Sequence, residues 1–141
     1  MPTTQTTALL NPYKCNHPSH DPNFRGELYW TMDDLVVAIR RCAELDLSAK
    51  LHATGDASVR QVLDAAEIVR QDADGSPSMQ IAHMSFNSEQ YLPRFAEINV
   101  AADACPFMWF PSPLNDGVGA FVADETLANI WPFKALSVTG A

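Results

Sequence analysis

The stretch Ser48-Ala49-Lys50-Leu51-His52-Ala53-Thr54-Gly55-Asp56 joins a short apolar run to a histidine and a helix-start signal. A second run, Met79-Gln80-Ile81-Ala82-His83, follows after about one β/α unit. Short apolar runs that are bounded by turn residues predict buried strands of a parallel sheet. The carboxyl ends of such strands are where catalytic groups and metal ligands sit. His52 and His83 are therefore the most specific chemical signal in the sequence.

The segments around these two runs alternate between helical and extended patterns. Thr31 and Asp34 resemble a capping box and precede an apolar stripe at helical spacing. Asp56 is expected to be the N-cap of the helix that follows the first strand. We expect strands over 48–52, 79–83 and 98–102, helices over 32–46, 56–71 and 88–96, a loop over 106–119, and a helical piece over 125–138 that Pro132 breaks. This alternation predicts an α/β fold with a parallel sheet.

Residues 1–27 differ in composition from the remainder of the chain. Several prolines and small polar residues favour turns in this part, so we expect an irregular arm or loop. Residues 28–141 are expected to form the ordered domain. Long segments without secondary structure are uncommon unless they cover a site or belong to something larger.

The bulk composition excludes several classes of protein. The chain has 141 residues, 47% of them hydrophobic, and a net charge of −8, which argues against a nucleic-acid partner. No apolar stretch approaches the roughly 20 residues that span a bilayer, so no membrane partner is expected. The N-terminus lacks the pattern of a signal peptide. Three scattered cysteines form neither a CxxC pair nor a disulfide framework, so the cytoplasm is the expected location.

The two strand-end histidines suggest a site for one divalent metal. Neutral imidazole is a common ligand for zinc and similar ions. A catalytic zinc normally takes three protein ligands, and Asp103 or Cys105 could reach the same rim. A single histidine at such a position is more often a structural residue, and Asp103 is more often a rim or capping residue. The pair His17 and His20 is more typical of a solvated loop.

Several motifs in chain order resemble the amidohydrolase superfamily, and most closely its amidohydrolase-3 branch. The segment Leu51–Ala57, followed by Val62-Leu63-Asp64-Ala65, is similar to the family pattern HAxGDxA…LDA. Further similar segments are Thr7–Tyr13, Gly26–Trp30, Ile81–Met84, Arg94–Ala96 and Asn99-Val100. The resemblance covers nearly the whole chain.

This resemblance implies part of a (β/α)8 TIM barrel, comprising strands five to seven within residues 28–141. It also implies a divalent metal, expected to be zinc, and hydrolysis of amide or other C–N bonds of a small molecule by a metal-activated water. His52 would be the ligand that ends strand five, and His83 the ligand that ends strand six. The family usually has Glu before the second histidine, where this chain has Ala82, which puts the orientation of that ligand in doubt.

The resemblance also implies that the remaining ligands lie outside residues 1–141. The paired-histidine strand and the lysine-bearing strand would precede residue 1, and the catalytic aspartate would follow Ala141. We therefore expect the isolated chain to be inactive and to self-associate through open sheet edges. The alternatives are a non-enzymatic β/α module that needs a partner chain, and a self-contained α/β domain. Trp109 could line an apolar substrate pocket, although packing of a long loop explains it equally well.

Overall fold

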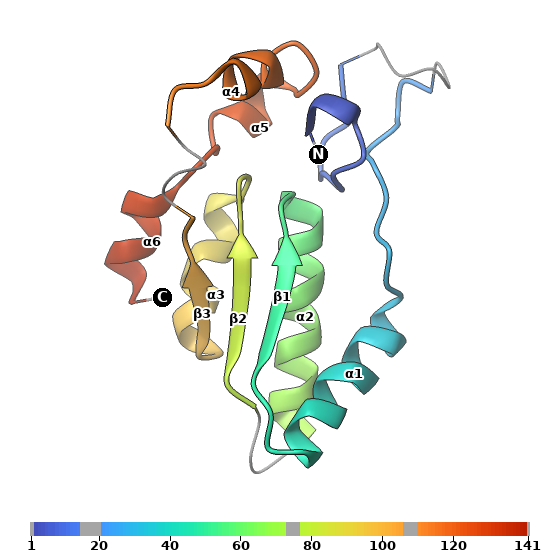
Figure 1. Cartoon of the computed structure of the whole chain (residues 1–141), viewed down its shortest axis with the longest axis vertical. Helices are drawn as coiled ribbons and strands as arrows, with labels where there is room; N and C mark the ends of the chain where they lie inside the picture. The colour runs from blue at the N-terminus through green and yellow to red at the C-terminus, as the bar shows by residue number, and fades with distance from the viewer. Residues whose placement is uncertain (1, 15–20, 73–76, 106–109, 141) are drawn as a thin grey trace.

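Three parallel strands form the centre of the fold in the computed structural model, which describes residues 2–14, 21–72, 77–105 and 110–140 (Figure 1). The strands β1 (Ala49–Ala53), β2 (Met79–His83) and β3 (Val100–Asp103) lie in the order β1-β2-β3. Ala53 pairs with His83, and Ala82 pairs with Asp103. The expected parallel α/β arrangement is confirmed.

Helices cover one face of this sheet. The helix α2 (Asp56–Asp72) connects β1 to β2, whereas η2 (Glu89–Tyr91) and α3 (Leu92–Glu97) connect β2 to β3. The helix α1 (Met32–Glu44) precedes β1 and packs against α2. Figure 1 shows α2 and α3 behind the sheet, with no helix in front of the strands. The described part of the chain therefore leaves one face of the sheet without a covering layer.

The first long helix follows from its sequence. The hydroxyl oxygen of Thr31 accepts a hydrogen bond from the backbone N–H of Asp34 at 3.2 Å and donates one to its carboxylate at 2.7 Å. The side chains that this helix buries are Leu35, Val36 and Ile39. These apolar residues face α2 because their spacing places them on one side of the helix. The expected cap and stripe are confirmed, although α1 ends at Glu44 rather than at residue 46.

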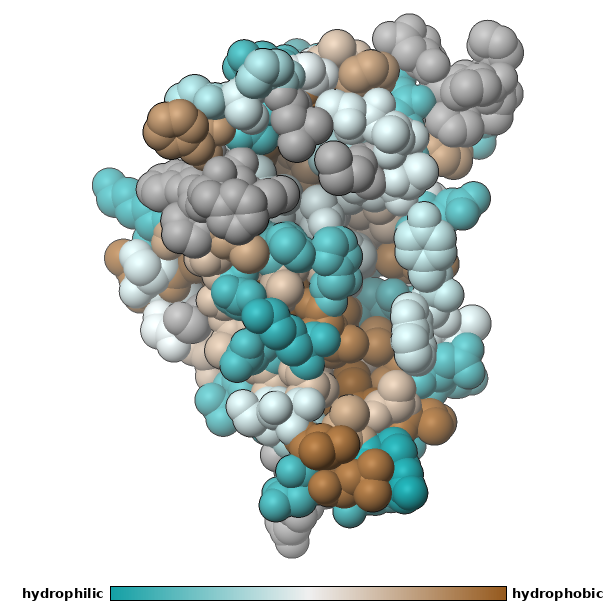
Figure 2. All heavy atoms as spheres, in the orientation of Figure 1, coloured by the Kyte–Doolittle hydropathy of each residue, from teal (hydrophilic) through white to brown (hydrophobic). Residues whose placement is uncertain are grey.

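The side chains of β1 alternate between the two faces of the sheet. Ala49 and Ala53 are buried against the helices, whereas Lys50 and His52 point to the uncovered face. On that face Lys50 Nζ lies 2.6 Å from Asp103 Oδ2, so an ion pair crosses from β1 to β3. Figure 2 shows hydrophilic side chains over the middle of this face and hydrophobic atoms in the hollow beside them. The uncovered face is therefore largely polar, with an apolar margin.

The described residues before α1 contain one short 3-10 helix, η1 (Pro2–Thr4), and are otherwise irregular, but they are packed into the fold. Leu9 and Tyr13 are buried, and their backbone N–H groups donate to Arg25 and Phe24. The hydroxyl of Tyr13 donates to the carbonyl of Thr7 at 2.7 Å, and burial raises the pKa of this phenol to about 12. These contacts fold the two parts of the segment, on either side of residues 15–20, against each other.

The region after β3 contains more helix than the sequence predicts. The expected loop over 106–119 includes α4 (Pro113–Val118), in which Ser112 accepts a hydrogen bond from the N–H of Asn115. The prediction of a loop is wrong over α4, because Ser112 and Pro113 form a helix start. Residues 106–109 of the predicted loop lie outside the described residues. The expected break at Pro132 separates α5 (Asp124–Leu127) from α6 (Phe133–Thr139). Among the described helices, none is long and apolar enough to cross a membrane.

Candidate metal centre

The two strand-end histidines are in contact. The ring centroids of His52 and His83 are 4.4 Å apart, and the rings are inclined at 61°. His52 lies in β1 and His83 ends β2, so both sit near the carboxyl edge of the sheet. The sequence predicts that the two histidines lie close together, and the structure brings their rings into contact.

The contact depends on an unusual backbone conformation at His83. The ladder pairs His83 with Ala53, which faces the helices, whereas His52 pairs with Ala82 on the uncovered face. Regular alternation would therefore point the two rings to opposite faces. His83 has φ 76° and Met84 has φ 43°, a region that side-chain-bearing residues rarely adopt. This local departure from strand geometry ends the alternation and brings the His83 ring beside His52.

Hydrogen bonds around the bend stabilise this backbone. The N–H of Met84 donates to Ala53 O at 2.9 Å, and the N–H of Phe86 donates to Thr54 O at 3.0 Å. The chain after β2 thus remains tied to the chain after β1. Such ties are needed, because a strained backbone conformation costs about 1–3 kcal/mol.

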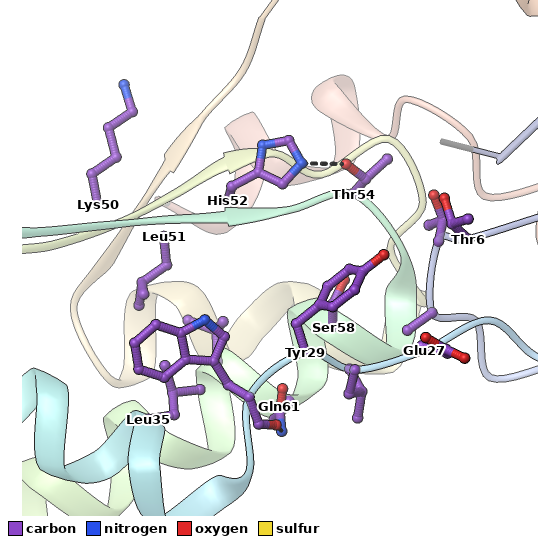
Figure 3. Close-up of a pocket in the computed structure, with 15 residues that line it drawn as sticks. Thr6, Glu27, Tyr29, Leu35, Lys50, Leu51, His52, Thr54, Ser58 and Gln61 are labelled. Atoms are coloured by element: carbon purple, nitrogen blue, oxygen red, sulfur yellow. Dashed lines mark hydrogen bonds between the residues drawn. The ribbon is translucent and has the colours of Figure 1, made fainter. Parts of the chain in front are cut away.

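The pKa of His52 and the hydrogen bonding of the two rings suit metal binding. Burial and the neighbouring His83 lower the pKa of His52, which favours the neutral ring at neutral pH. Nε2 of His52 lies 3.2 Å from the Thr54 hydroxyl (Figure 3). Nδ1 of His83 is buried and has no hydrogen-bond partner among the described residues. A buried nitrogen without a partner is costly, and a bound metal or substrate group would satisfy it.

The described residues place no third ligand beside this pair. Asp103 pairs with Lys50, and this contact raises the pKa of the Lys50 ammonium. Cys105 Sγ lies 4.0 Å from the backbone carbonyl of Asp103. Among the described residues, no group of three or more His, Cys, Asp or Glu side chains could hold a metal ion. The two imidazoles therefore fit two positions of a ligand set that needs further members.

Asp56 has a different role from the predicted one. It is the first residue of α2, and its carboxylate accepts hydrogen bonds from the N–H of Leu10 at 2.8 Å and of Ala57 at 3.0 Å. The prediction that Asp56 is the N-cap is therefore wrong. The helix start instead uses Ser58, whose hydroxyl donates to the carbonyl of Gly55 at 2.7 Å. Asp56 ties the N-terminal segment to the end of β1.

Other residues that the sequence singles out lie outside the described residues. These are His17, His20 and Trp109. Phe110, which follows Trp109, is described and is 73% exposed. The expected substrate contact of Trp109 stays a prediction.

Two hollows adjoin the histidines. A groove of about 400 Å³ runs along β1, and its lining includes Leu35, Leu51 and Trp30. Figure 3 shows Tyr29 and Leu35 on the same side of the strand as Leu51. Figure 3 shows Lys50 and His52 on the opposite side of this strand from Leu51.

The second hollow is a cavity of about 260 Å³, here called the histidine-side cavity. It opens onto both rings, and its described lining also includes Ser85, Phe86, Asn115, Val118, Ile130 and Trp131. Sequence reasoning missed this cavity, because its walls come from segments far apart in the chain.

Comparison with known proteins gives a consistent result. The model of the amidohydrolase family matches residues 2–140. An uncharacterized metal-dependent hydrolase from Pyrococcus furiosus is similar, with a TM-score of 0.80 and 28% identity over 99% of this chain and 27% of that chain. A second, from Pyrococcus horikoshii, has a TM-score of 0.73 and 22% identity over 99% of this chain and 26% of that chain. This chain thus spans about a quarter of either structure. No curated protein matches it.

Proposed function

The chain belongs to the amidohydrolase family, and from this premise we propose that it forms strands five to seven of a metal-dependent hydrolase barrel. In this proposal His52 and His83 are two ligands of one divalent metal. The observation that carries it is the contact of the two rings at the ends of neighbouring parallel strands, 4.4 Å between centroids. The similarity to a metal-dependent hydrolase at 28% identity supports the same assignment.

The proposed reaction is hydrolysis of an amide or related C–N bond in a small molecule. A divalent metal, expected to be zinc, would supply an activated water and polarise the scissile carbonyl. The chain's own contribution is to hold two imidazoles in fixed positions. His52 is oriented by Thr54, and the bend at His83 fixes the direction of the second ring.

We further propose that residues 1–141 alone are inactive. Two imidazoles are fewer than the three protein ligands that a catalytic zinc normally takes. The described residues hold no third ligand beside them. Purified chain with added zinc should therefore show no amide hydrolysis. Turnover that His52→Ala or His83→Ala abolishes would contradict this expectation.

Metal binding tests the ligand assignment directly. Titration of the chain with Co²⁺, followed by visible absorption, should show weak binding that involves imidazole. His52→Ala and His83→Ala should each weaken it by at least about tenfold, since losing even an outer-shell partner costs 10–100-fold. His17→Ala and His20→Ala are the matched controls and should bind as the parent chain does. If the controls lose binding and the strand-end variants keep it, the assignment is wrong.

A second candidate is a non-enzymatic β/α module that pairs with another chain. The uncovered sheet face and the two free strand edges favour this reading. A cytoplasmic location is part of both proposals, because Cys42 and Cys105 are free thiols among the described residues. Metal titration separates the two candidates, because a module without a metal centre has no reason to bind Co²⁺ through His52 and His83.

A further inference from the structure

The histidine-side cavity points to the kind of substrate that the site accepts. We propose that it is a subsite for an uncharged, apolar group of the substrate, such as a single aromatic ring or a short branched chain next to the scissile amide. This inference rests on the proposed function, because it takes the two imidazoles as the place where the reacting bond lies. The groove along β1 is excluded from this role, since Glu27 and Lys50 are among its lining residues.

The walls of the cavity are apolar and buried. Phe86 is fully buried and Val118 is 4% exposed, whereas Ile130 and Trp131 are partly exposed. Apolar walls with a few polar groups are typical of ligand pockets. An apolar substrate group bound in this position would stabilise the complex, because its apolar surface leaves water.

Backbone pairing fixes one wall of the cavity. Phe86 forms an isolated antiparallel bridge with Ile130, and the N–H of Trp131 donates to Ser85 O at 2.9 Å. These contacts join the chain after β2 to the segment between α5 and α6. The same bend after β2 positions the His83 ring and one wall of the cavity. The position of the cavity relative to the ring is therefore fixed.

The volume of the cavity limits the size of the group. A cavity of about 150 Å³ is known to hold benzene, and pockets for drug-sized ligands begin near 300 Å³. The histidine-side cavity measures about 260 Å³. It therefore has room for one substituted ring or a short branched chain, and it is too small for a second ring system.

The charge of the lining limits the chemistry of the group. No Asp, Glu, Lys or Arg is among its described lining residues. The polar groups there are the two rings, the hydroxyls of Thr54 and Ser85, and the Asn115 amide. A substrate carboxylate or ammonium placed in the cavity would lack an ionic partner, and burying an unpaired charge is costly. The cavity thus selects against charged substituents.

Binding of small amides to the whole chain tests this inference without a catalytic assay. The probes are benzamide, acetamide and 4-carbamoylbenzoate, each followed by methyl NMR shifts. We expect benzamide to bind at least about tenfold more tightly than acetamide. One extra methylene in an apolar pocket already separates two ligands by about 10–200-fold, and benzamide adds a whole ring. Benzamide should shift the methyl signals of Val118 and Ile130. The charged probe should bind as weakly as acetamide.

Substitutions in the wall locate the binding. Ile130→Phe should fill the cavity and remove benzamide binding, whereas Val138→Phe, at an 81% exposed position on α6, should leave it unchanged. Trp131→Ala is the second variant, in case Ile130→Phe does not fold, and it should weaken binding by removing one wall. Equal affinity for benzamide and acetamide, or shifts confined to residues along β1, would overturn the inference.

The two proposals fail in different ways. No metal is required for benzamide binding, and no benzamide is required for Co²⁺ binding. If Co²⁺ binding depends on His52 and His83 but benzamide does not bind, the subsite is wrong and the metal site stands. If benzamide binds but Co²⁺ binding is unchanged in the His52 and His83 variants, the metal site is wrong. The cavity then binds an apolar group, but no reaction can be assigned to it.

Discussion

At the scale of single residues, the carboxylate of Asp56 joins two parts of the chain that are distant in sequence. It is 5% exposed and accepts hydrogen bonds from the N–H of Leu10 and of Ala57. Asp56→Ala leaves both donors without this acceptor and should lower the free energy of unfolding by about 1–3 kcal/mol. Asp56→Asn keeps an acceptor oxygen and should cost much less. Urea unfolding of the three proteins measures the difference, and equal losses in both variants would contradict the role as acceptor.

The charge on Asp56 adds a pH dependence. Burial raises the pKa of this carboxyl above its ordinary value of 3.8. A raised pKa means that the folded state binds the proton more tightly than the unfolded state does. The stability that proton binding contributes is therefore complete below pH 3.8, and it is lost as the pH rises through the folded-state pKa. Relative to the parent chain, Asp56→Asn should therefore become more stable as the pH rises from 3.8 towards neutrality. If the difference in free energy of unfolding between the two proteins stays constant across this pH range, the pKa of Asp56 is not raised.

His83 shows where residue-level prediction from sequence ends. The apolar run predicts its strand, and the strand end predicts its place on the rim. The direction of its ring depends on the φ values of 76° and 43° at His83 and Met84, which neither residue favours. Those values are maintained by hydrogen bonds to Ala53, the last residue of β1, and to Thr54, which follows it. Local sequence carries no signal for a conformation that distant contacts impose.

At the scale of elements, the start of α2 packs against the N-terminal segment through Gly55. A Cβ added there would overlap the carbonyl oxygen of Ala8 and crowd the methyl group of Thr7. Gly55→Ala should therefore displace the segment and lower the free energy of unfolding by about 1–3 kcal/mol, as overpacking does.

A second glycine gives the control for this prediction. Gly117 lies within α4, and a Cβ there would meet only Thr3 Cγ2 at 3.8 Å, an ordinary contact. Gly117→Ala should raise the free energy of unfolding by about 0.5–1 kcal/mol, because alanine loses less entropy in a helix. Thermal unfolding of both variants tests the pair, and destabilisation by Gly117→Ala alone would contradict it.

Elements with strong periodicity were predictable, and those formed by distant contacts were not. The run Met79–His83 predicts β2 to the residue, and the stripe after Thr31 predicts α1. The bridge between Phe86 and Ile130 joins two irregular segments that carry no strand pattern. This bridge builds one wall of the histidine-side cavity. The two histidines proposed as metal ligands were therefore visible in the sequence, whereas the adjoining pocket was not.

At the scale of the whole molecule, the sheet has a bare face and two free edges in the described residues. The edge of β1 borders the groove where Leu28, Tyr29 and Trp30 are 45%, 79% and 52% exposed. Free parallel edges beside exposed apolar side chains are a template for pairing with another chain. We therefore propose that the isolated chain self-associates along β1 as its concentration rises.

Light scattering coupled to size exclusion tests this proposal across a wide range of concentrations. The double variant Tyr29→Lys and Trp30→Lys should remain monomeric to higher concentration, because charge and lysine protect an exposed edge. The hydrogen bond that the side-chain amide of Gln61 donates to the backbone carbonyl of Trp30 does not depend on the side chains at 29 and 30, so the fold should persist. Val138→Lys, on the distant helix α6, is the control and should associate as the parent chain does. A parent chain that stays monomeric at every concentration would show that the open edge is harmless, and it would favour a self-contained α/β domain.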